Sequence, residues 1–324
     1  MTTTAISLRA PFPYFGGKSR AVTTVWQRFG QVANYVEPFC GSAAVLLAAP
    51  EGRRIETIND ADGFVANFWR SAAWEPDAVA YYADWPVSEI DLDARHAWLV
   101  NRSERLRWQL EDPDFYDPKI AGYWCWGTCI WIGSGFCSGD GPHHTNGANF
   151  FNARKLPHLG DAGRGINRQL PHLGDAGRGE RKEFILQWMR DLQSRLRDVR
   201  ISCGDWTRVL ESSVTTRHGL TGVFLDPPYT KGEMNYAAGG VGGDLSSAVR
   251  MWCVTSGNDE NLRIVLCGHA GEHDELLRHG WSVAAWRARK GYANSEEALQ
   301  NTADETLWCS PNCDAAAQGA LDMF

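Results

Sequence analysis

The chain has 324 residues, enough for one large domain or two ordinary ones with a real hydrophobic core. Hydrophobic residues make up 44% and charged residues 22%, as in water-soluble globular proteins, and no segment approaches the roughly 18 consecutive apolar residues of a membrane span. The net charge of −7 argues mildly against a nucleic-acid partner. The N-terminus shows no apolar core of signal-peptide length, so we expect a cytoplasmic protein that binds no membrane.

The nine cysteines are odd in number and lie in a chain of ordinary size, which favours reduced thiols over a disulfide framework. Cys125, Cys129 and Cys137 lie close together, but without the paired C-x-x-C spacing of zinc sites. We expect them to be small buried residues beside the neighbouring tryptophans, and we predict no bound metal. A zinc site is the alternative.

The first part of the chain has the order strand, glycine turn, helix, strand. Residues 34–37 form a short apolar-leaning run that stops at a proline, and the turn 39–42 follows. Residues 43–49 are good helix formers, and residues 54–58 alternate as a strand does. This order predicts the opening of a doubly wound, mostly parallel α/β sheet, as in Rossmann-like folds.

The middle of the chain differs in texture. Residues 70–197 are rich in Trp, Tyr and charge, with helical patterns over 93–109 and 181–197 and a glycine-rich aromatic stretch over 122–151. We interpret residues 70–198 as an inserted, mainly helical domain with a long loop over 122–151. A loop of that length inside a compact chain is usually functional or disordered.

A basic segment with a repeat lies in this middle part. Residues 150–200 hold eleven Lys and Arg against six Asp and Glu, a net charge of +5. Leu156–Gly165 reads LPHLGDAGRG, and Leu170–Gly179 is identical at all ten positions. Glycine-rich backbone with periodic cations could follow a chain of phosphates. The alternatives are a solvated helix surface for the charges and a tandem duplication in a tolerant loop for the repeat.

The last part of the chain returns to short buried strands. We predict strands over 199–203, 222–225, 262–267, 281–285 and 305–309, and a helix over 272–279 that ends at a glycine.

The strongest local signal is Asp226-Pro227-Pro228-Tyr229, which follows the strand that ends at Leu225. In open α/β sheets the active site lies at the carboxyl ends of the strands. An exocyclic amine on a base is a poor nucleophile, and an Asp carboxylate and a Pro carbonyl can both accept its hydrogens. The prolines fix the backbone, and Tyr229 can stack on the base. A simple turn with a capping Asp is the alternative.

A second signal follows the first predicted strand. Val36-Glu37-Pro38-Phe39-Cys40-Gly41-Ser42 has the order expected of a nucleoside cofactor site, with Gly41 permitting close backbone approach. A G-x-G-x-x-G pattern is absent, which argues against a nicotinamide cofactor. Roughly 20 residues past the turn, Asp60 ends the second strand and is placed to bind ribose hydroxyls. A helix N-cap is the alternative for Asp60.

Taken together with two further clusters, these motifs resemble the adenine-specific DNA methyltransferases typified by the Dam enzymes. The resemblance rests on F-x-Y-x-G-G-K from Phe12, E-P-F-C-G-S from Glu37, N-D from Asn59, G-D-W from Gly204 and D-P-P-Y from Asp226, in that order. It covers residues 11–69 and 199–310 and is specific as a set.

The resemblance implies a sheet with one antiparallel strand near its edge and S-adenosylmethionine as the methyl donor. It places Lys18 near the methionyl carboxylate, Asp60 at the ribose and Asp205 by the adenine ring. The target amine would be held by Asp226, Pro227, Pro228 and Tyr229. The family often has glycine where this chain has Ala43, a change that we expect to matter little. The residues expected to bind the cofactor are Tyr14, Lys18, Glu37, Pro38, Phe39, Cys40, Gly41, Ser42, Asp60, Asp205 and Trp206.

The sequence therefore predicts a DNA amino methyltransferase that acts on flipped adenine in double-stranded DNA, in a bacterial or phage-infected cell. Residues 1–69 and 199–324 would form the catalytic domain, and 70–198 the target-recognition domain. We expect DNA contacts at Arg164, Arg168, Arg178, Arg181 and Lys182. A cytosine-N4 enzyme, a methyltransferase acting on RNA or protein, and a catalytically inactive DNA-binding protein are the rival interpretations.

Overall fold

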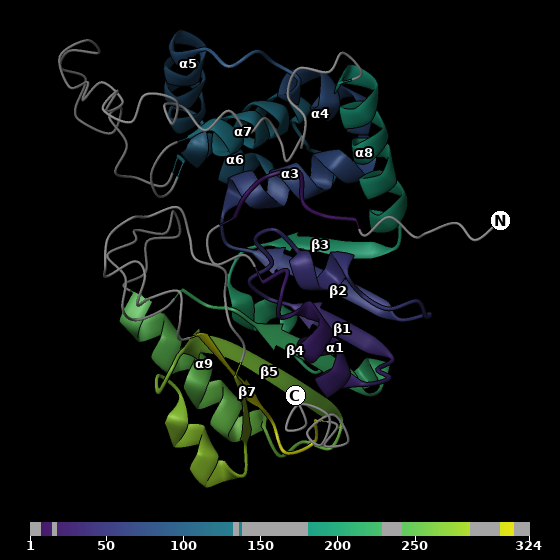
Figure 1. Cartoon of the computed structure of the whole chain (residues 1–324), viewed down its shortest axis with the longest axis vertical. Coiled ribbons are helices and arrows are strands. Elements are labelled where there is room, and N and C mark those ends of the chain that lie inside the picture. Colours follow the sequence, from purple (N-terminus) through teal and green to yellow (C-terminus); the bar gives the residue numbers. More distant parts are fainter. Residues whose placement is uncertain are drawn as a thin grey trace.

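A single seven-stranded sheet, in the order β3-β2-β1-β4-β5-β7-β6, forms the centre of the computed structural model (Figure 1). The structure describes residues 8–14, 18–131, 136–137, 181–228, 242–285 and 305–313. The strands β3, β2, β1, β4 and β5 pair in parallel, and β7 runs antiparallel to both β5 and β6. The strands are β1 (Asn34–Glu37), β2 (Ile55–Asp60), β3 (Val199–Cys203), β4 (Thr221–Leu225), β5 (Leu262–His269), β6 (Ser282–Ala285) and β7 (Glu305–Cys309).

Both faces of the sheet are covered, because buried residues alternate between two hydrophobic clusters along the strands. Tyr35 of β1 and Phe224 of β4 belong to the cluster that packs against α1 (Val22–Phe29), while Val36 and Val223 belong to the cluster under α9 (Gly242–Ser256). This alternation confirms the predicted doubly wound, mostly parallel α/β architecture. The remaining sheet-flanking elements are α2 (Ala44–Leu47), η1 (Trp206–Val209), η2 (Thr216–His218) and η3 (Asp274–His279).

The described residues between β2 and β3 are mainly helical, as predicted. Its helices are α3 (Gly63–Trp74), α4 (Pro76–Ala83), α5 (Glu89–Val100), α6 (Ser103–Gln109), α7 (Pro118–Ile130) and α8 (Arg181–Leu196). Polar side chains begin three of them by accepting a backbone N–H, namely Asp62 for α3, Ser88 for α5 and Asp117 for α7.

The helices share a continuous buried cluster with one face of the sheet, through α3 and α8 beside β3 (Figure 1). The predicted boundary at residue 69 falls inside α3, which continues to Trp74 without a break.

Arg195 anchors the end of this helical segment to the sheet. Its guanidinium donates to both carboxylate oxygens of Glu56 on β2, at 2.6 and 2.9 Å, and to the carbonyl of Leu46 on α2, at 2.8 Å. A two-pronged bond of this kind is geometrically specific. It fixes α8 so that β3, which starts three residues after α8 ends, enters the sheet next to β2.

Several aromatic residues of the helical segment serve internal packing. The guanidinium of Arg95 is nearly buried and lies 4.6, 4.1 and 4.4 Å from the ring centroids of Trp85, Tyr123 and Trp126. These cation–π contacts join α5 to α7. The abundance of Trp and Tyr in this part of the sequence is thus partly explained by its own core.

Three sequence predictions differ from the observed elements. The helix predicted over 93–109 is two helices, because the N–H of Arg102 turns back to the carbonyl of Leu99 and the hydroxyl of Ser103 donates to the carbonyl of Val100. The helix predicted over 272–279 is the shorter 3-10 helix η3, because the carboxylate of Glu272 accepts from the N–H of His269 and closes the preceding turn.

The third difference concerns residues 122–151, which we predicted to form a long loop. This prediction is wrong for the first part of the stretch. Residues up to Ile130 belong to α7. Glycine serves close packing here: a Cβ on Gly122 would lie 2.4 Å from the Cβ of Tyr82 and 2.8 Å from the carbonyl oxygen of Val79. Gly122 therefore allows the close approach of α4 and α7.

We expect Gly122→Ala to lower the free energy of unfolding by about 1–3 kcal/mol, because the new methyl must push α4 away from α7. Gly63→Ala is the matched control, since a Cβ there would meet only ordinary contacts, the nearest at 3.4 Å. Urea unfolding of both variants measures the difference. A Gly122→Ala protein as stable as the wild type would contradict this account of the packing.

Candidate active site

The predicted site residues meet at one edge of the sheet. Parallel strands end on the same side, so the residues that follow β1, β2, β3 and β4 are neighbours there. Asp60 at the end of β2 lies opposite Cys203 at the end of β3. Because β7 is antiparallel, its first residue, Glu305, also lies at this edge, opposite His269 of β5.

The turn after β1 has the backbone that its glycine predicted. Gly41 has a φ of 43°, and a Cβ on it would lie 2.4 Å from Cε1 of the Tyr14 ring. The carbonyl of Gly41 accepts a hydrogen bond from the indole of Trp69 at 2.9 Å. The turn is therefore held between Tyr14 on one side and α3 on the other, with no room for a side chain at position 41.

Ala43 corrects one expectation. It has a φ of 47° and a ψ of 34°, the left-handed conformation that glycine adopts without steric cost. For alanine this conformation costs roughly 1–2 kcal/mol. The replacement of the family's frequent glycine by Ala43 therefore stores strain in the turn, and the expectation that it matters little is wrong.

Asp60 holds this turn and is not the cap of the following helix. Its Oδ2 accepts from the N–H of Gly41 and its Oδ1 from the N–H of Asp62, both at 2.9 Å. The N-cap of α3 is Asp62, whose Oδ1 accepts from the N–H of Phe64. Burial, followed by the nearby charge of Asp62, raises the pKa of Asp60 to about 7. Asp60 as a whole residue is partly exposed.

Asn59 is a site residue for which sequence reasoning assigned no role. Its side-chain amide donates to the carbonyl of Pro38 and to the carbonyl of Gly204, each at 3.0 Å. Asn59 is buried and thus ties the loop after β1 to the loop after β3. The sequence signal that could have identified Asn59 was its position beside Asp60, at the end of β2, which lies between β1 and β3.

Glu37 is buried beneath the turn, with 2% of its surface exposed. The hydroxyl of Tyr35 and the N–H of Leu46 both donate to its Oε2, at 2.9 and 3.3 Å. Burial raises the pKa of Glu37 to about 8. Through the hydrogen bond to Leu46, Glu37 links the end of β1 to α2 and so stabilises the turn between them.

The other predicted cofactor residues surround the same loops. Phe39 stacks on Trp206 with the ring centroids 6.0 Å apart and the planes at 29°. Asp205 begins η1 by accepting the N–H of Thr207 at 2.9 Å. Cys40 is buried, and Pro38 and Ser42 belong to the turn itself.

Lys18 forms ion pairs with two carboxylates of the site. Its ammonium lies 3.0 Å from Oδ1 of Asp226, at the end of β4, and 3.7 Å from Oε1 of Glu305. Burial would lower the pKa of Lys18, but the negative charge of Asp226, with smaller contributions from Cys267 and Glu305, raises it overall. The lysine is therefore a charged group in a largely buried position, with 4% of its side chain exposed.

Several predicted residues lie outside the described parts of the chain. These are Tyr229, Arg164, Arg168 and Arg178, together with the side chains of Arg181 and Lys182. Both copies of the ten-residue repeat also lie there. Their roles stay predictions.

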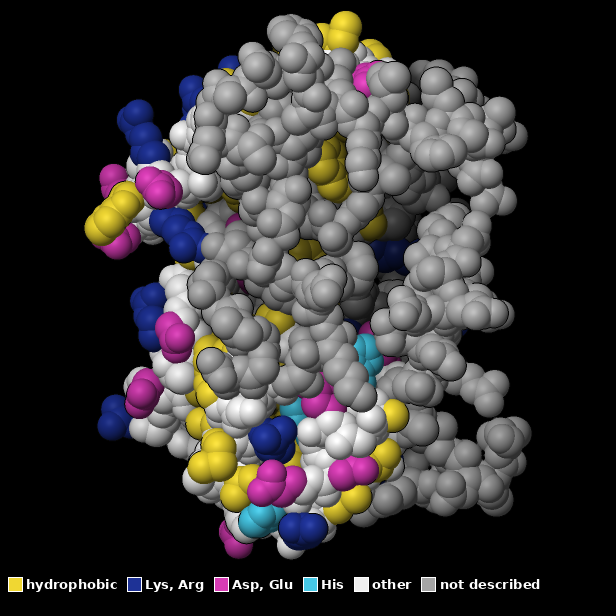
Figure 2. All heavy atoms as spheres, turned by 90° about the vertical axis from the view of Figure 1, so that its left-hand side faces the viewer, with side chains coloured by type: hydrophobic (Ala, Val, Ile, Leu, Met, Phe, Trp, Pro, Cys, Tyr) yellow, Lys and Arg dark blue, Asp and Glu magenta, His cyan; other side chains and the backbone are white. Residues whose placement is uncertain are grey.

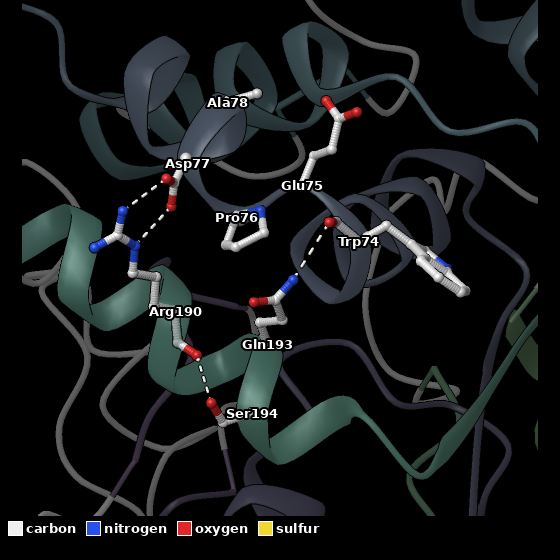
Figure 3. A pocket seen from close by; sticks show the side chains of 8 residues that line it. All are labelled: Trp74, Glu75, Pro76, Asp77, Ala78, Arg190, Gln193 and Ser194. Carbon is white, nitrogen blue, oxygen red and sulfur yellow. Dashed lines mark hydrogen bonds and ion pairs between the residues drawn. The ribbon is translucent and has the colours of Figure 1, made fainter.

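A separate pocket lies between the start of α4 and α8, among Trp74, Asp77 and Arg190 (Figure 3). Arg190 makes two hydrogen bonds to the Asp77 carboxylate, at 2.8 and 2.7 Å, and Gln193 donates to the carbonyl of Trp74. None of the predicted cofactor or catalytic residues lines it. The chemistry expected from the sequence thus belongs to the strand ends and not to this pocket.

Among the described residues, no group of three or more His, Cys, Asp or Glu has an arrangement that could hold a metal ion. Cys125, Cys129 and Cys137 form no disulfide and are buried in the helical core. No described helix is long and apolar enough to cross a membrane.

The sheet order and the site at its strand ends are compatible with a Rossmann-like methyltransferase. Residues 14–96 match the model of a protein family described as D12 class N6 adenine-specific DNA methyltransferase. The matched part includes Tyr14, Lys18, the turn after β1 and Asp60, and it ends before Asp226. This match supports the resemblance seen in the motifs, because it is to the same family, whose members are S-adenosylmethionine-dependent transferases acting on adenine in DNA. It covers 83 of the 324 residues. No curated protein matches the chain.

We expect Glu37→Gln to flatten the dependence of stability on pH. Folded Glu37 keeps its proton up to a pKa of about 8, whereas an ordinary glutamic acid loses it at 4.5. The folded state therefore binds more protons between these values, so the free energy of unfolding falls as the pH rises through this window. Urea unfolding near both ends of the window should show a loss about 1 kcal/mol or more larger in the wild type than in the variant. Equal losses in both proteins would show that Glu37 is ionised at neutral pH.

A second expectation separates the two acids after β2. Asp60→Ala should weaken cofactor binding by ~1.5–3 kcal/mol, because it removes a charged acceptor and releases Gly41. Asp62→Ala should lower stability by about 1 kcal/mol through loss of the helix cap and leave cofactor affinity unchanged. Calorimetric titration with S-adenosylmethionine measures the affinity of each variant. The assignment of Asp60 does not survive if both variants bind the cofactor as tightly as the wild type.

Proposed function

We propose that this chain transfers a methyl group from S-adenosylmethionine to the N6 amine of an adenine that is flipped out of double-stranded DNA at specific sites. The proposal is carried by one observation: Asp226, which follows β4 next to the end of β1, is ion-paired with Lys18. The match to the adenine methyltransferase family over residues 14–96 supports it independently.

Asp226 and the prolines after it suit the chemistry of the amine. The lone pair of an exocyclic amine is delocalised into the base, so the nitrogen must be drawn toward a tetrahedral geometry before it can attack. A carboxylate and the carbonyls of this segment are acceptors for its two hydrogens, and Pro227 and Pro228 contribute no competing N–H donor. Asp226 and the two prolines then act mainly by holding the amine in line with the methyl group that is transferred.

The residues around the turn fit the proposed cofactor. Gly41 lets the turn pack directly against Tyr14, and Asp60 places a carboxylate at the end of β2, where an acid suits ribose hydroxyls. Carboxyl groups outnumber cations at this edge, which favours a positively charged sulfonium. S-adenosylmethionine supplies the reactive methyl group when bound.

The charge of the helical segment bears on where DNA would bind. Residues 63–131 carry six Lys and Arg against eleven Asp and Glu, a net charge of −5, in contrast to +5 for residues 150–200. On the face shown in Figure 2, most of the Lys and Arg side chains that are drawn lie close to Asp or Glu, along the left-hand side and at the bottom. Arg190 and Arg195 of α8 are engaged by Asp77 and Glu56. These charges favour the remaining cations of residues 150–200 as the phosphate contacts.

Asp226→Ala should abolish methyl transfer and leave S-adenosylmethionine binding largely intact, because the residue faces the amine and not the cofactor's ribose. Asp226→Asn should fail as well, since an amide N–H would point at the amine's own hydrogens. Nucleoside analysis of DNA treated with the wild type and each variant measures the product, and calorimetry measures cofactor binding.

The same analysis discriminates between the rival functions. N6-methyladenine supports the proposal, whereas N4-methylcytosine would assign the pocket to the other base. Retention of a tenth of the wild-type turnover, or more, in Asp226→Ala would remove Asp226 from the mechanism. A wild type that binds DNA but neither binds S-adenosylmethionine nor forms a methylated product would be an inactive DNA-binding protein.

A further inference from the structure

The ammonium of Lys18 lies between two carboxylates. Asp226 Oδ1 is 3.0 Å away and Glu305 Oε1 is 3.7 Å away, and the three side chains are 4%, 19% and 11% exposed. Water therefore screens these pairs far less than it screens surface ion pairs. Glu305 lies outside the residues matched by the family model, and the sequence motifs gave it no role.

The reversed strand explains why Glu305 is at this place. β7 begins where β4 and β5 end, with Glu305 opposite His269 across the β5–β7 ladder. A parallel strand in the same position would have put its last residue at this edge instead. The antiparallel strand thus brings a carboxylate from far along the chain next to Lys18.

Glu305 is poorly arranged for a purely structural role. Its Oε2 is buried and has no hydrogen-bond partner among the described residues. Burial raises the pKa of Glu305 even though Lys18 opposes the shift. A buried acceptor without a partner costs stability, so packing alone would favour an apolar residue here.

We propose that Glu305 is a positioning residue of the methyl-transfer site, which holds the Lys18 ammonium in place and so keeps the Asp226 carboxylate available to the target amine. This inference rests on the proposed function. An ammonium has three donors, and without Glu305 the Lys18 ammonium would turn more of them toward Asp226 and compete with the amine. A second carboxylate shares the ammonium and limits that competition.

The first test measures the contact without any methylation. Wild type, Glu305→Gln and Glu305→Asp are labelled briefly with an amine-acetylating reagent, and mass spectrometry gives the rate at Lys18 relative to Lys119. Loss of the Glu305 charge should lower the pKa of Lys18, and a pKa lower by about 1 gives about tenfold more of the reactive neutral amine.

We therefore expect Lys18 labelling to rise roughly three- to tenfold in Glu305→Gln and to return toward the wild-type rate in Glu305→Asp. Glu275→Gln is the matched control. It removes the same charge from a residue that is 57% exposed and pairs with Arg250, and labelling should not change. An unchanged Lys18 rate in Glu305→Gln overturns the proposal.

The second test is a double-mutant cycle in single-turnover methylation at saturating S-adenosylmethionine. With Lys18 present, Glu305→Gln should slow methyl transfer about tenfold, with the affinity for S-adenosylhomocysteine unchanged. In the Lys18→Gln background the same change should cost nothing, or speed the reaction, because Asp226 and Glu305 would otherwise repel each other. Equal slowing in both backgrounds would mean that Glu305 does not act through Lys18, and overturns the proposal.

The two tests keep the failure of this inference apart from the failure of the proposed function. If the wild type methylates no DNA, the proposed function fails, and labelling still decides whether Glu305 holds Lys18. If the wild type methylates DNA and Glu305→Gln does so at the same rate, the function stands and the positioning role is wrong. Melting temperatures of all variants confirm that each is folded.

Discussion

The parallel run of β3, β2, β1 and β4 is the constraint on which the rest of this molecule depends. It puts four strand ends on one edge, so residues separated by about two hundred positions become neighbours. Asn59 secures this edge by bonding the loops that follow β1 and β3, and Asp60 secures the turn at Gly41. The antiparallel β7 completes the site, because reversal brings its first residue to the same edge.

The site concentrates carboxyl groups at a cost to the folded state. Glu37 and Asp60 have raised pKa values because burial disfavours their charged forms. Lys18 is held between Asp226 and Glu305, which exceed it in charge. A protein selected for stability alone would avoid such a cluster. It is consistent with a site that receives a cation and an amine that becomes positive as it is methylated.

The helical segment between β2 and β3 differs in composition along its length. Its described helices use their aromatic rings and cations largely on one another, as Arg95 does among three rings and Arg195 does at Glu56. Residues 63–131 carry a net charge of −5. This part of the helical segment is a scaffold joined to the sheet by α3 and α8, which leaves the basic residues 150–200 as the segment whose composition suits phosphate.

The sequence by itself indicated the order of the motifs along the chain, the mostly parallel α/β class, the resemblance to a family and the turn after β1, because each rests on local chemistry. Strands need alternating or continuous apolar runs, Gly41 needs a positive φ, and Asp226 follows its strand directly. Only the tertiary structure decided that Gly122 serves close packing and that Ala43 is strained, since identical residue types occur in loops and in tight helix contacts. The same holds for Asp60, which bonds Gly41 and leaves the helix cap to Asp62. Sequence reasoning could not identify Glu305, because its partner Lys18 lies near the other end of the chain. Only the pairing of β7 with β5 brings the two residues together.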